Sequence, residues 1–404
     1  MSQRAIIVCT CLMACVVCTR IGLVTPHQRQ ATGQRRASII AGHRVLKVLN
    51  ADNSWMHASI FYPAVIFEDK AGRYWVGSDS DVGLLQMYDE RTQQWWAYGR
   101  QERDERNILH FIGGAIIPTD VRRVAQSRDG KLWFCSAWAE NMGDPNGAYV
   151  STFDGKRWEK FEIKHDRPGT NCIGFCRDRD GVLWFWNKDE LSSYDGQHWS
   201  PTLNVTELLK AVAARQPDRL LAHERRAGRP YDILEAISAR DGCLWLATLH
   251  GVVRFDPRKG EWTPYPDIGP YSTDYLYEDH AGRIWIGDTG SKKEVQVYDK
   301  SRGVVARYAL GEHIPWAGEV EEITSLVHAI YQDRQGRMLF AVGRWLLSFS
   351  EATGKWEAFS AETIGMTYLN INGEVLPAGE IMNIMEDSQG RIWITGRSGI
   401  AVLE

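Results

Sequence analysis

Three carboxylates at one repeated position are the residues of this 404-residue chain best placed to bind a ligand. Asp120, Asp232 and Glu380 each stand ten residues before the glycine of a recurring motif. In three other copies the equivalent residues are Tyr62, Asn171 and Ser272. Such oxygen-bearing side chains suit sugar hydroxyls or a Ca²⁺ ion. We expect a polar-ligand site if the fold gathers these positions; otherwise they begin strands and face water.

A basic insert follows at residues 204–228 and beyond. A helix is expected from Thr206 as N-cap, and its apolar side before Pro217 consists of Leu208, Leu209, Val212 and Ala213. After this helix come Arg219, Arg225, Arg226 and Arg229. They either cover an anionic ligand or form a solvated surface.

Catalytic motifs are missing from the sequence. It contains no Gly-x-Ser-x-Gly, His-Glu-x-x-His or P-loop pattern. The residues from which a lyase or hydrolase site would have to be assembled are His110, His250, His313, Glu312, Glu319 and Glu321. We therefore expect ligand binding rather than catalysis and no cofactor, with Ca²⁺ as the ion that would fit. A lyase or hydrolase acting on a polysaccharide or glycoconjugate is the alternative, and a protein-docking scaffold the second.

The elements that must position these residues repeat seven times. A motif of the type "GRIWI" begins at Gly72, Gly130, Gly181, Gly242, Gly282, Gly336 and Gly390. Six copies place a tryptophan three residues later: Trp75, Trp133, Trp184, Trp245, Trp285 and Trp393. Apolar runs flank an Asp-x-x-Gly turn in "IFEDKAG" and "LYEDHAG", which predicts a tight hairpin. A further strand pair per unit gives four antiparallel strands, as in a propeller blade.

We therefore predict an all-β, seven-bladed β-propeller of four-stranded antiparallel blades over residues 43–404. The last unit stops at "GIAVLE" after its third strand. His43–Trp55 resembles the part of a repeat unit that runs from the third to the fourth strand, without the first half of the unit. We expect this N-terminal strand to close the last blade.

Most of the conspicuous motif residues have a structural explanation in such a fold. Asp69, Asp279, Asp333 and Asp387 should hold the turns, and the tryptophans should fill the spaces between blades. Length varies only in the connections between blades and between second and third strands, which share one face. Long loops on a rigid scaffold favour ligand binding on that face.

The repeats resemble the two-component regulator propeller repeat, with "MEDSQGRIWITGRSGIAVLE" and "ARDGCLWLATLHGVVRFDPRKGEW" as close matches. The resemblance implies that such a propeller forms the extracellular sensor region of a membrane kinase, which often senses glycans. We expect no kinase and no second membrane span in this chain. A polar small molecule or glycan is the expected partner, together with a separate sensor or surface protein.

The N-terminal residues and the net charge indicate where the protein is located and which partners it has. Residues 1–18 are typical of a signal peptide or lipoprotein leader, and Leu12–Cys15 resembles a lipobox that would lipidate Cys15. Plain secretion and an uncleaved anchor are the alternatives. Residues 19–42 read as a flexible tether. We expect an extracytoplasmic protein, periplasmic or secreted, that meets the membrane only through this leader or its lipid. The net charge of −4 predicts no nucleic-acid partner.

Overall fold

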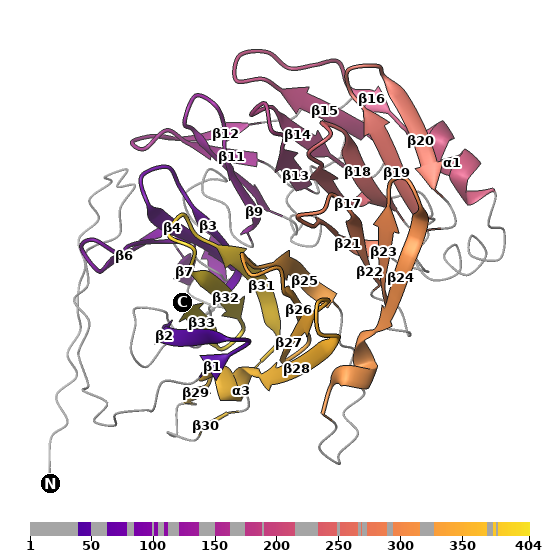
Figure 1. Ribbon diagram of the computed structural model, residues 1–404. Helices are drawn as coiled ribbons and strands as arrows, with labels where there is room; N and C mark the ends of the chain where they lie inside the picture. Colours follow the sequence, from indigo (N-terminus) through magenta and orange to yellow (C-terminus); the bar gives the residue numbers. More distant parts are fainter. Residues whose placement is uncertain are drawn as a thin grey trace, which may run out of the picture.

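Seven antiparallel sheets are arranged radially in the computed structural model (Figure 1). It describes residues 39–49, 63–78, 85–98, 101–103, 109–111, 121–136, 150–161, 174–187, 190–214, 233–248, 251–265, 268, 273–288, 294–315, 327–369, 375–376 and 379–404. The first strands of neighbouring blades contact one another all the way round the ring, so they are the innermost strands. The predicted seven-bladed propeller is confirmed.

The blades follow one another in chain order. Blade 1 consists of β3 (Pro63–Glu68), β4 (Arg73–Ser78), β5 (Leu85–Asp89) and β6 (Gln94–Tyr98). Blade 2 consists of β9 (Val121–Gln126), β10 (Leu132–Ser136), β11 (Val150–Phe153) and β12 (Trp158–Phe161). Blade 3 consists of β13 (Gly174–Arg177), β14 (Leu183–Trp186), β15 (Glu190–Tyr194) and β16 (Leu203–Asn204). Blade 4 consists of β17 (Ile233–Ser238), β18 (Leu244–Thr248), β19 (Gly251–Asp256) and β20 (Glu261–Tyr265).

The remaining blades keep this plan. Blade 5 consists of β21 (Thr273–Glu278), β22 (Ile284–Asp288), β23 (Glu294–Asp299) and β24 (Gly303–Ala309). Blade 6 consists of β25 (Val327–Gln332), β26 (Met338–Val342), β27 (Trp345–Ser350) and β28 (Lys355–Ser360). Blade 7 holds β31 (Ile381–Glu386), β32 (Ile392–Gly396) and β33 (Gly399–Leu403). Small elements between blades are β7 (Gln101–Arg103), β8 (Leu109–Phe111), α1 (Thr206–Ala213), η2 (Leu310–His313), α3 (Ala361–Ile364), β29 (Tyr368–Leu369) and β30 (Val375–Leu376).

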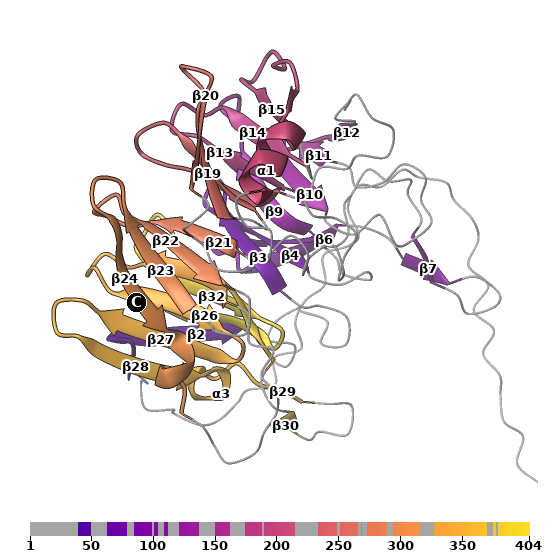
Figure 2. The ribbon, with the colours of Figure 1, turned by 90° about the vertical axis from the view of Figure 1, so that its right-hand side faces the viewer.

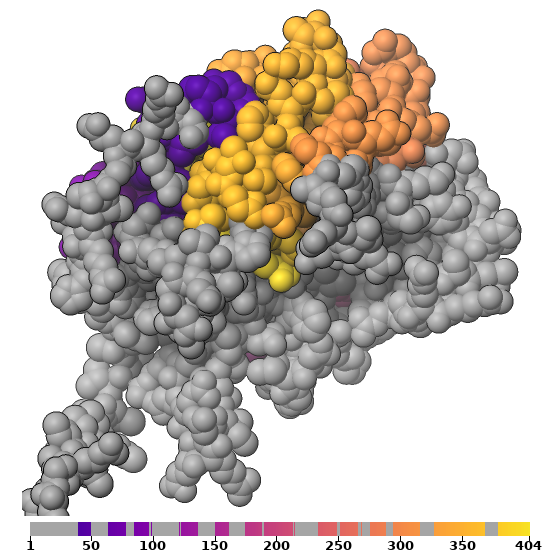
Figure 3. Space-filling view, turned by 90° about the horizontal axis from the view of Figure 1, so that it is seen from below, coloured from indigo at the N-terminus to yellow at the C-terminus, as the bar shows by residue number. Residues whose placement is uncertain are grey.

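The N-terminal strand closes the ring. β2 (His43–Leu49) pairs antiparallel with β33, matching Val45 with Leu403 and Leu49 with Ile400. Figure 3 shows indigo N-terminal residues beside gold residues from the C-terminal part of the chain. The predicted closure is confirmed for residues 43–49, and residues 50–55 lie outside the described residues. The propeller begins earlier in the chain than residue 43. Because β1 (Ile39–Ile40) pairs with β2, residues 39–42 belong to the propeller rather than to the tether.

A bulge in β2 lets the closing strand contact three blades. The register shifts between Val45 and Lys47, so side chains on either side of the shift face different neighbours. Towards blade 6, His43 Nε2 lies 3.1 Å from Asp333 Oδ2. Towards blade 1, the Lys47 ammonium pairs with the Glu90 carboxylate.

The repeated motif works as predicted. All seven motif glycines have positive φ, between 71° at Gly72 and 90° at Gly130. In blade 5, Asp279 Oδ1 accepts the Arg283 backbone N–H at 2.9 Å, and Oδ2 accepts the Trp285 indole N–H at 2.8 Å. The six motif tryptophans are buried in clusters that join neighbouring blades. Their assignment as inter-blade packing is confirmed.

Unit 6 lacks the tryptophan, and the N-terminal strand compensates. Leu339 occupies the tryptophan position and is fully buried between blades 6 and 7. The carboxylate oxygen that accepts an indole N–H in other blades, here Asp333 Oδ2, contacts His43 instead, and it keeps the contact with the motif arginine, here Arg337, that those blades also have. The closing strand thus supplies the polar group that the blade itself is missing.

Short turns and long connections lie on opposite faces. On the short-turn face, backbone N–H groups of one blade's turn are accepted by side chains of the next blade. Examples are Lys70 N–H to Gln126 Oε1 at 2.8 Å and His280 N–H to Gln332 Oε1 at 2.6 Å. Figure 2 shows the ring from its edge, with β7 and the β29–β30 pair on the side away from these turns.

Helix α1 fixes part of the long-connection face between blades 3 and 4. Leu209 and Val212 are buried against Trp186 and Ile233, which confirms the predicted helix and its apolar face. Its start differs from the prediction: Thr206 is already helical and the N-cap is Val205, because the Asn204 side chain accepts the Thr206 N–H at 3.0 Å. None of the helices in the described part of the chain is long and apolar enough to cross a membrane.

Candidate functional site

Most of the predicted site residues lie outside the described part of the chain. The first group is Tyr62, Asp120, Asn171, Asp232 and Ser272, which together with Glu380 were predicted to surround the long-connection end of the central channel, here called the axial mouth. The others are Arg219, Arg225, Arg226 and Arg229 of the basic insert, and Cys15. The structure therefore neither gathers nor separates them. Glu380 is the predicted mouth residue that it does describe.

Glu380 is held firmly at the long-connection end of blade 7, immediately before the innermost strand β31. Its carbonyl oxygen accepts the Arg397 N–H at 3.0 Å, and Arg397 Nη2 lies 3.1 Å from Glu380 Oε2. The neighbouring Gly379 N–H donates to Ser398 Oγ at 2.6 Å. A side chain at Gly396 would collide with the Glu380 carbonyl, so glycine is required for this close approach.

His328 lies beside this carboxylate and was not predicted from the sequence. Its Nε2 is 3.9 Å from Glu380 Oε1, and the residue is 9% exposed. His328 falls at the bulge of β25, where the register shifts between Val327 and Ala329. β-Bulges re-aim side chains and are common next to binding sites. Most innermost strands begin with such a bulge. The first residues of each innermost strand are therefore the positions at which sequence reasoning could have looked for His328.

Electrostatics favour a charged carboxylate at this position. The His328 imidazole lowers the pKa of the Glu380 carboxyl, burial opposes this, and the Arg397 guanidinium adds to the lowering. The net effect holds the pKa of Glu380 below its usual range, so the group is an ionised hydrogen-bond acceptor at neutral pH.

Further charged groups of blade 6 surround the site on the same face. The Gly343 carbonyl accepts the Ile381 N–H at 2.7 Å, which places the turn between β26 and β27 next to Glu380. In that turn, Arg344 Nη2 donates to Glu362 Oε1 of α3 at 2.7 Å. The described part of the long-connection face thus presents alternating cations and anions, an arrangement suited to polar ligands.

The candidate catalytic residues are not brought together among the described residues. His250, Glu319 and Glu321 lie outside them, and His110 lies in β8. The His313 ring stacks on Trp356 with centroids 4.1 Å apart, and burial lowers the pKa of His313. No three His, Cys, Asp or Glu side chains gather as a metal would require anywhere in the described ranges.

Three cysteines lie in the described part of the chain. Cys176 and Cys243 are free thiols, Cys135 is buried in β10, and Cys172 lies outside the described residues. Burial and the nearby Asp178 carboxylate raise the pKa of Cys176 to about 12, so its thiol stays protonated and unreactive at neutral pH.

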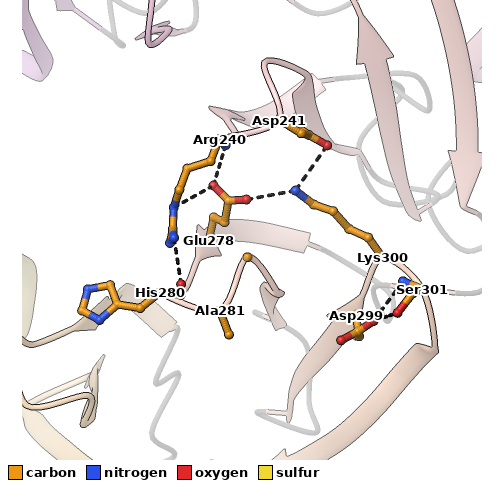
Figure 4. Close-up of a pocket in the computed structure, with 9 residues that line it drawn as sticks. Arg240, Asp241, Glu278, His280, Ala281, Asp299, Lys300 and Ser301 are labelled. Atoms are coloured by element: carbon orange, nitrogen blue, oxygen red, sulfur yellow. Dashed lines mark hydrogen bonds and ion pairs between the residues drawn. The ribbon is translucent and has the colours of Figure 1, made fainter.

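A groove of about 480 Å³ lies on the opposite, short-turn face between blades 4 and 5 (Figure 4). Its charged side chains are already paired. Lys300 Nζ lies 2.9 Å from Glu278 Oε1 and 3.3 Å from Asp241 Oδ2, while Arg240 Nε lies 3.6 Å from Glu278 Oε2. These pairs neutralise one another, so the groove joins two blades rather than offering free ligand-binding groups.

Two departures from the repeat explain the groove. At the boundaries between blades 5 and 6 and between blades 7 and 1, Arg283 pairs with Glu351 and Arg391 with Glu90. At the boundary between blades 4 and 5 the arginine position holds the buried Cys243. Lys300 takes the place of the glutamate, so the bridging guanidinium is missing.

Comparison with known families supports the predicted resemblance. Residues 375–398 match the family model described as Two component regulator propeller. The resemblance inferred from the repeats is thus confirmed at this repeat, which contains Glu380 and Arg397. No curated protein sequence matches the chain.

Solved structures share the fold at low sequence identity. A catalytically inactive variant of virginiamycin B lyase from Staphylococcus aureus with quinupristin has a TM-score of 0.58 and 13% identity, covering 88% of this chain and 98% of that one. The extracellular domain of a putative one component system from B. thetaiotaomicron has a TM-score of 0.55 and 19% identity. That match covers 87% of this chain and 39% of the other, so this chain spans about two fifths of that protein's length. These likenesses establish the propeller fold.

Proposed function

We propose that this chain is an extracytoplasmic ligand-binding propeller that holds a polar ligand, such as a glycan, on the face of its long connections. The observation that carries the proposal is the setting of Glu380. Its ionised carboxylate stands at the inner edge of that face, braced by Arg397 and facing a buried histidine. The short-turn face, by contrast, is occupied by hydrogen bonds and ion pairs between blades.

The remaining predicted residues extend this proposal. Asp120 and Asp232 stand at the same repeat position as Glu380, so the ring would bring their carboxylates to the same end of the central channel. The arginines of the basic insert would meet a carboxylate or sulfate on the ligand. The family match and the extracellular domain with the same fold support a sensor-like role outside the cytoplasm, through a separate signalling or surface protein.

A ligand screen followed by matched variants tests the proposal. Thermal shift with neutral and acidic oligosaccharides, each with and without Ca²⁺, identifies a ligand for calorimetry. Glu380→Gln, and separately Asp120→Asn with Asp232→Asn, should each weaken binding about ten- to hundredfold, because each removes charged hydrogen-bond acceptors. The paired aspartate variants should change Tm little, whereas Glu380→Gln should also lose the modest stabilisation of its ion pair with Arg397. Glu261→Gln, an exposed glutamate at the short-turn end of β20, is the matched control and should leave affinity unchanged.

The competing functions predict different results. Affinity that ignores both Glu380→Gln and the paired aspartate variants would place the site elsewhere. Product formation from a polysaccharide would favour a lyase or hydrolase, the activity class of the similar lyase structure. Capture of a protein partner without any small-molecule binding would favour a docking scaffold.

A further inference from the structure

The contact between His328 and Glu380 leaves one hydrogen-bonding group without a partner. His328 is about nine-tenths buried, and its Nε2 makes no hydrogen bond to the residues that the structure describes. Buried polar atoms of this kind nearly always have a partner, from the protein or from a bound molecule. The atom that Nε2 faces is Glu380 Oε1 at 3.9 Å, beyond hydrogen-bond distance.

The distance suits an inserted oxygen atom. An oxygen can lie at an ordinary hydrogen-bond length of about 2.8 Å from both atoms at once, because they are less than twice that length apart. The other carboxylate oxygen, Oε2, is held by Arg397 at 3.1 Å, so Oε1 keeps its orientation towards the histidine. The two side chains therefore form a fixed slot for one atom.

The chemistry of the slot selects the group that enters it. Nε2 can donate an N–H, and the ionised carboxylate can only accept. A hydroxyl satisfies both, since it accepts from the imidazole and donates to Oε1. A carbonyl or a ligand carboxylate has no hydrogen for Oε1, and an ammonium has no lone pair for the N–H.

Access to the slot is from one side. The Glu380 side chain is 31% exposed, whereas the Nε2 atom of His328 is covered. A ligand group must enter past the carboxylate, and it gives up the hydrogen bonds that it made to water outside. Only a group that makes both hydrogen bonds in the slot compensates for that loss.

We propose that His328 and Glu380 bind one hydroxyl group of the ligand between them and so distinguish a polyhydroxylated ligand from its deoxygenated analogue. This inference rests on the proposed function and specifies the ligand class that this part of the face recognises. His328 becomes a binding residue, and Arg397 positions the carboxylate.

The experiment compares ligands that differ by a single hydroxyl. The probes are methyl α-D-glucoside, methyl α-D-galactoside and methyl β-D-xyloside with their monodeoxy analogues, measured by calorimetry and ligand-observed NMR. The unmodified protein should bind at least one parent glycoside and lose about ten- to hundredfold in affinity for one of its monodeoxy forms. In His328→Phe and Glu380→Gln the parent and that monodeoxy form should bind with similar affinity.

Controls separate loss of recognition from loss of folding. His198→Phe replaces an exposed histidine on the short-turn face and should keep full discrimination. Melting curves show whether His328→Phe is folded, and Glu380→Gln gives the same readout at the more exposed partner. If a parent glycoside binds and both site variants still discriminate against the monodeoxy form, this inference is wrong while the proposed function stands. Binding of none of the probes or larger oligosaccharides by the unmodified protein would overturn both.

Discussion

The indole N–H of a motif tryptophan finds its acceptor six residues earlier in the chain, and blade 4 is the exception. Trp75, Trp285 and Trp393 donate to an aspartate at that position. In blade 4 the position is Ala239, and Trp245 Nε1 is buried with no partner among the described residues. A buried donor without a partner costs stability, so this blade carries a local defect.

Ala239→Ser should repair the defect. In blade 2 a serine fills the same role, because Ser127 Oγ accepts the Trp133 indole N–H at 2.9 Å. The serine hydroxyl at position 239 should accept the Trp245 indole N–H and raise the free energy of unfolding by about 1 kcal/mol. Urea denaturation monitored by tryptophan fluorescence measures the change.

The tryptophan itself provides the control for this substitution. In a Trp245→Phe background there is no indole donor, so Ala239→Ser should give no gain. An equal gain in both backgrounds would show that the serine acts on the turn and not on the indole.

Residue identity explains which of these groups could be predicted from the sequence. Asp69 and Gly72 were predictable because a tight turn needs a short acceptor and a positive φ at fixed positions. His328 was not, because its role depends on a bulge that turns its side chain towards Glu380, a residue of another blade. Glu380 was predicted only because the repeat numbering carries from one blade to the next.

The hairpin turn of blade 7 should make the propeller sensitive to acid. Burial alone would raise the pKa of the Asp387 carboxyl, but hydrogen bonds from the Trp393 indole and from Arg391 outweigh it and hold the pKa below its ordinary value. A carboxyl whose pKa is lower when folded stabilises the protein above its unfolded pKa. That contribution is lost as the pH falls through the folded pKa.

Asp387→Asn measures this contribution. The variant should be clearly less stable than the unmodified protein at pH 6 to 7, and the difference should shrink as the pH falls below about 4. Chemical denaturation at a series of pH values gives both curves. A difference that stays constant down to pH 3 would mean that the turn does not depend on the ionised carboxylate.

Secondary-structure elements also differ in how well they could be predicted from the sequence. The short hairpins could be predicted because their turn chemistry is local, and the periodic apolar residues of α1 indicated a helix. The start of α1 was misplaced by one residue, because the Asn204 side chain accepts the Thr206 N–H and Val205 becomes the N-cap, which the residue type of Thr206 alone did not indicate. Which residues gather at the mouth depends on long connections, which lack any repeating pattern.

Closure of the ring should determine the stability of the entire molecule. Deletion of residues 1–38 removes nothing that the structure places in a blade, so Tm should be unchanged. Deletion of residues 1–50 removes β1 and β2, exposes the edge of β33 and breaks the contacts of His43 with Asp333 and of Lys47 with Glu90. The free energy of unfolding should then fall by several kcal/mol, measured by calorimetry.

A complementation experiment distinguishes lost pairing from a general effect of truncation. A synthetic peptide of residues 39–50 should bind the shorter protein and raise its Tm, and the same peptide with His43→Ala and Lys47→Ala should do so less. Equal Tm values for the two truncated proteins would contradict the closing role of β2.

The pairing of β2 with β33 also sets an order of events during synthesis. Arg44 and Glu404, which pair across this seam, lie 360 residues apart in the chain. At ribosomal speeds of about 5–20 residues per second, the strand made early waits on the order of 20–70 seconds for its mate. During that interval the apolar side chains of β2, such as Val45 and Val48, have no blade to cover them. Until translation delivers β33, these side chains are therefore either exposed to solvent or covered by something other than their own blade.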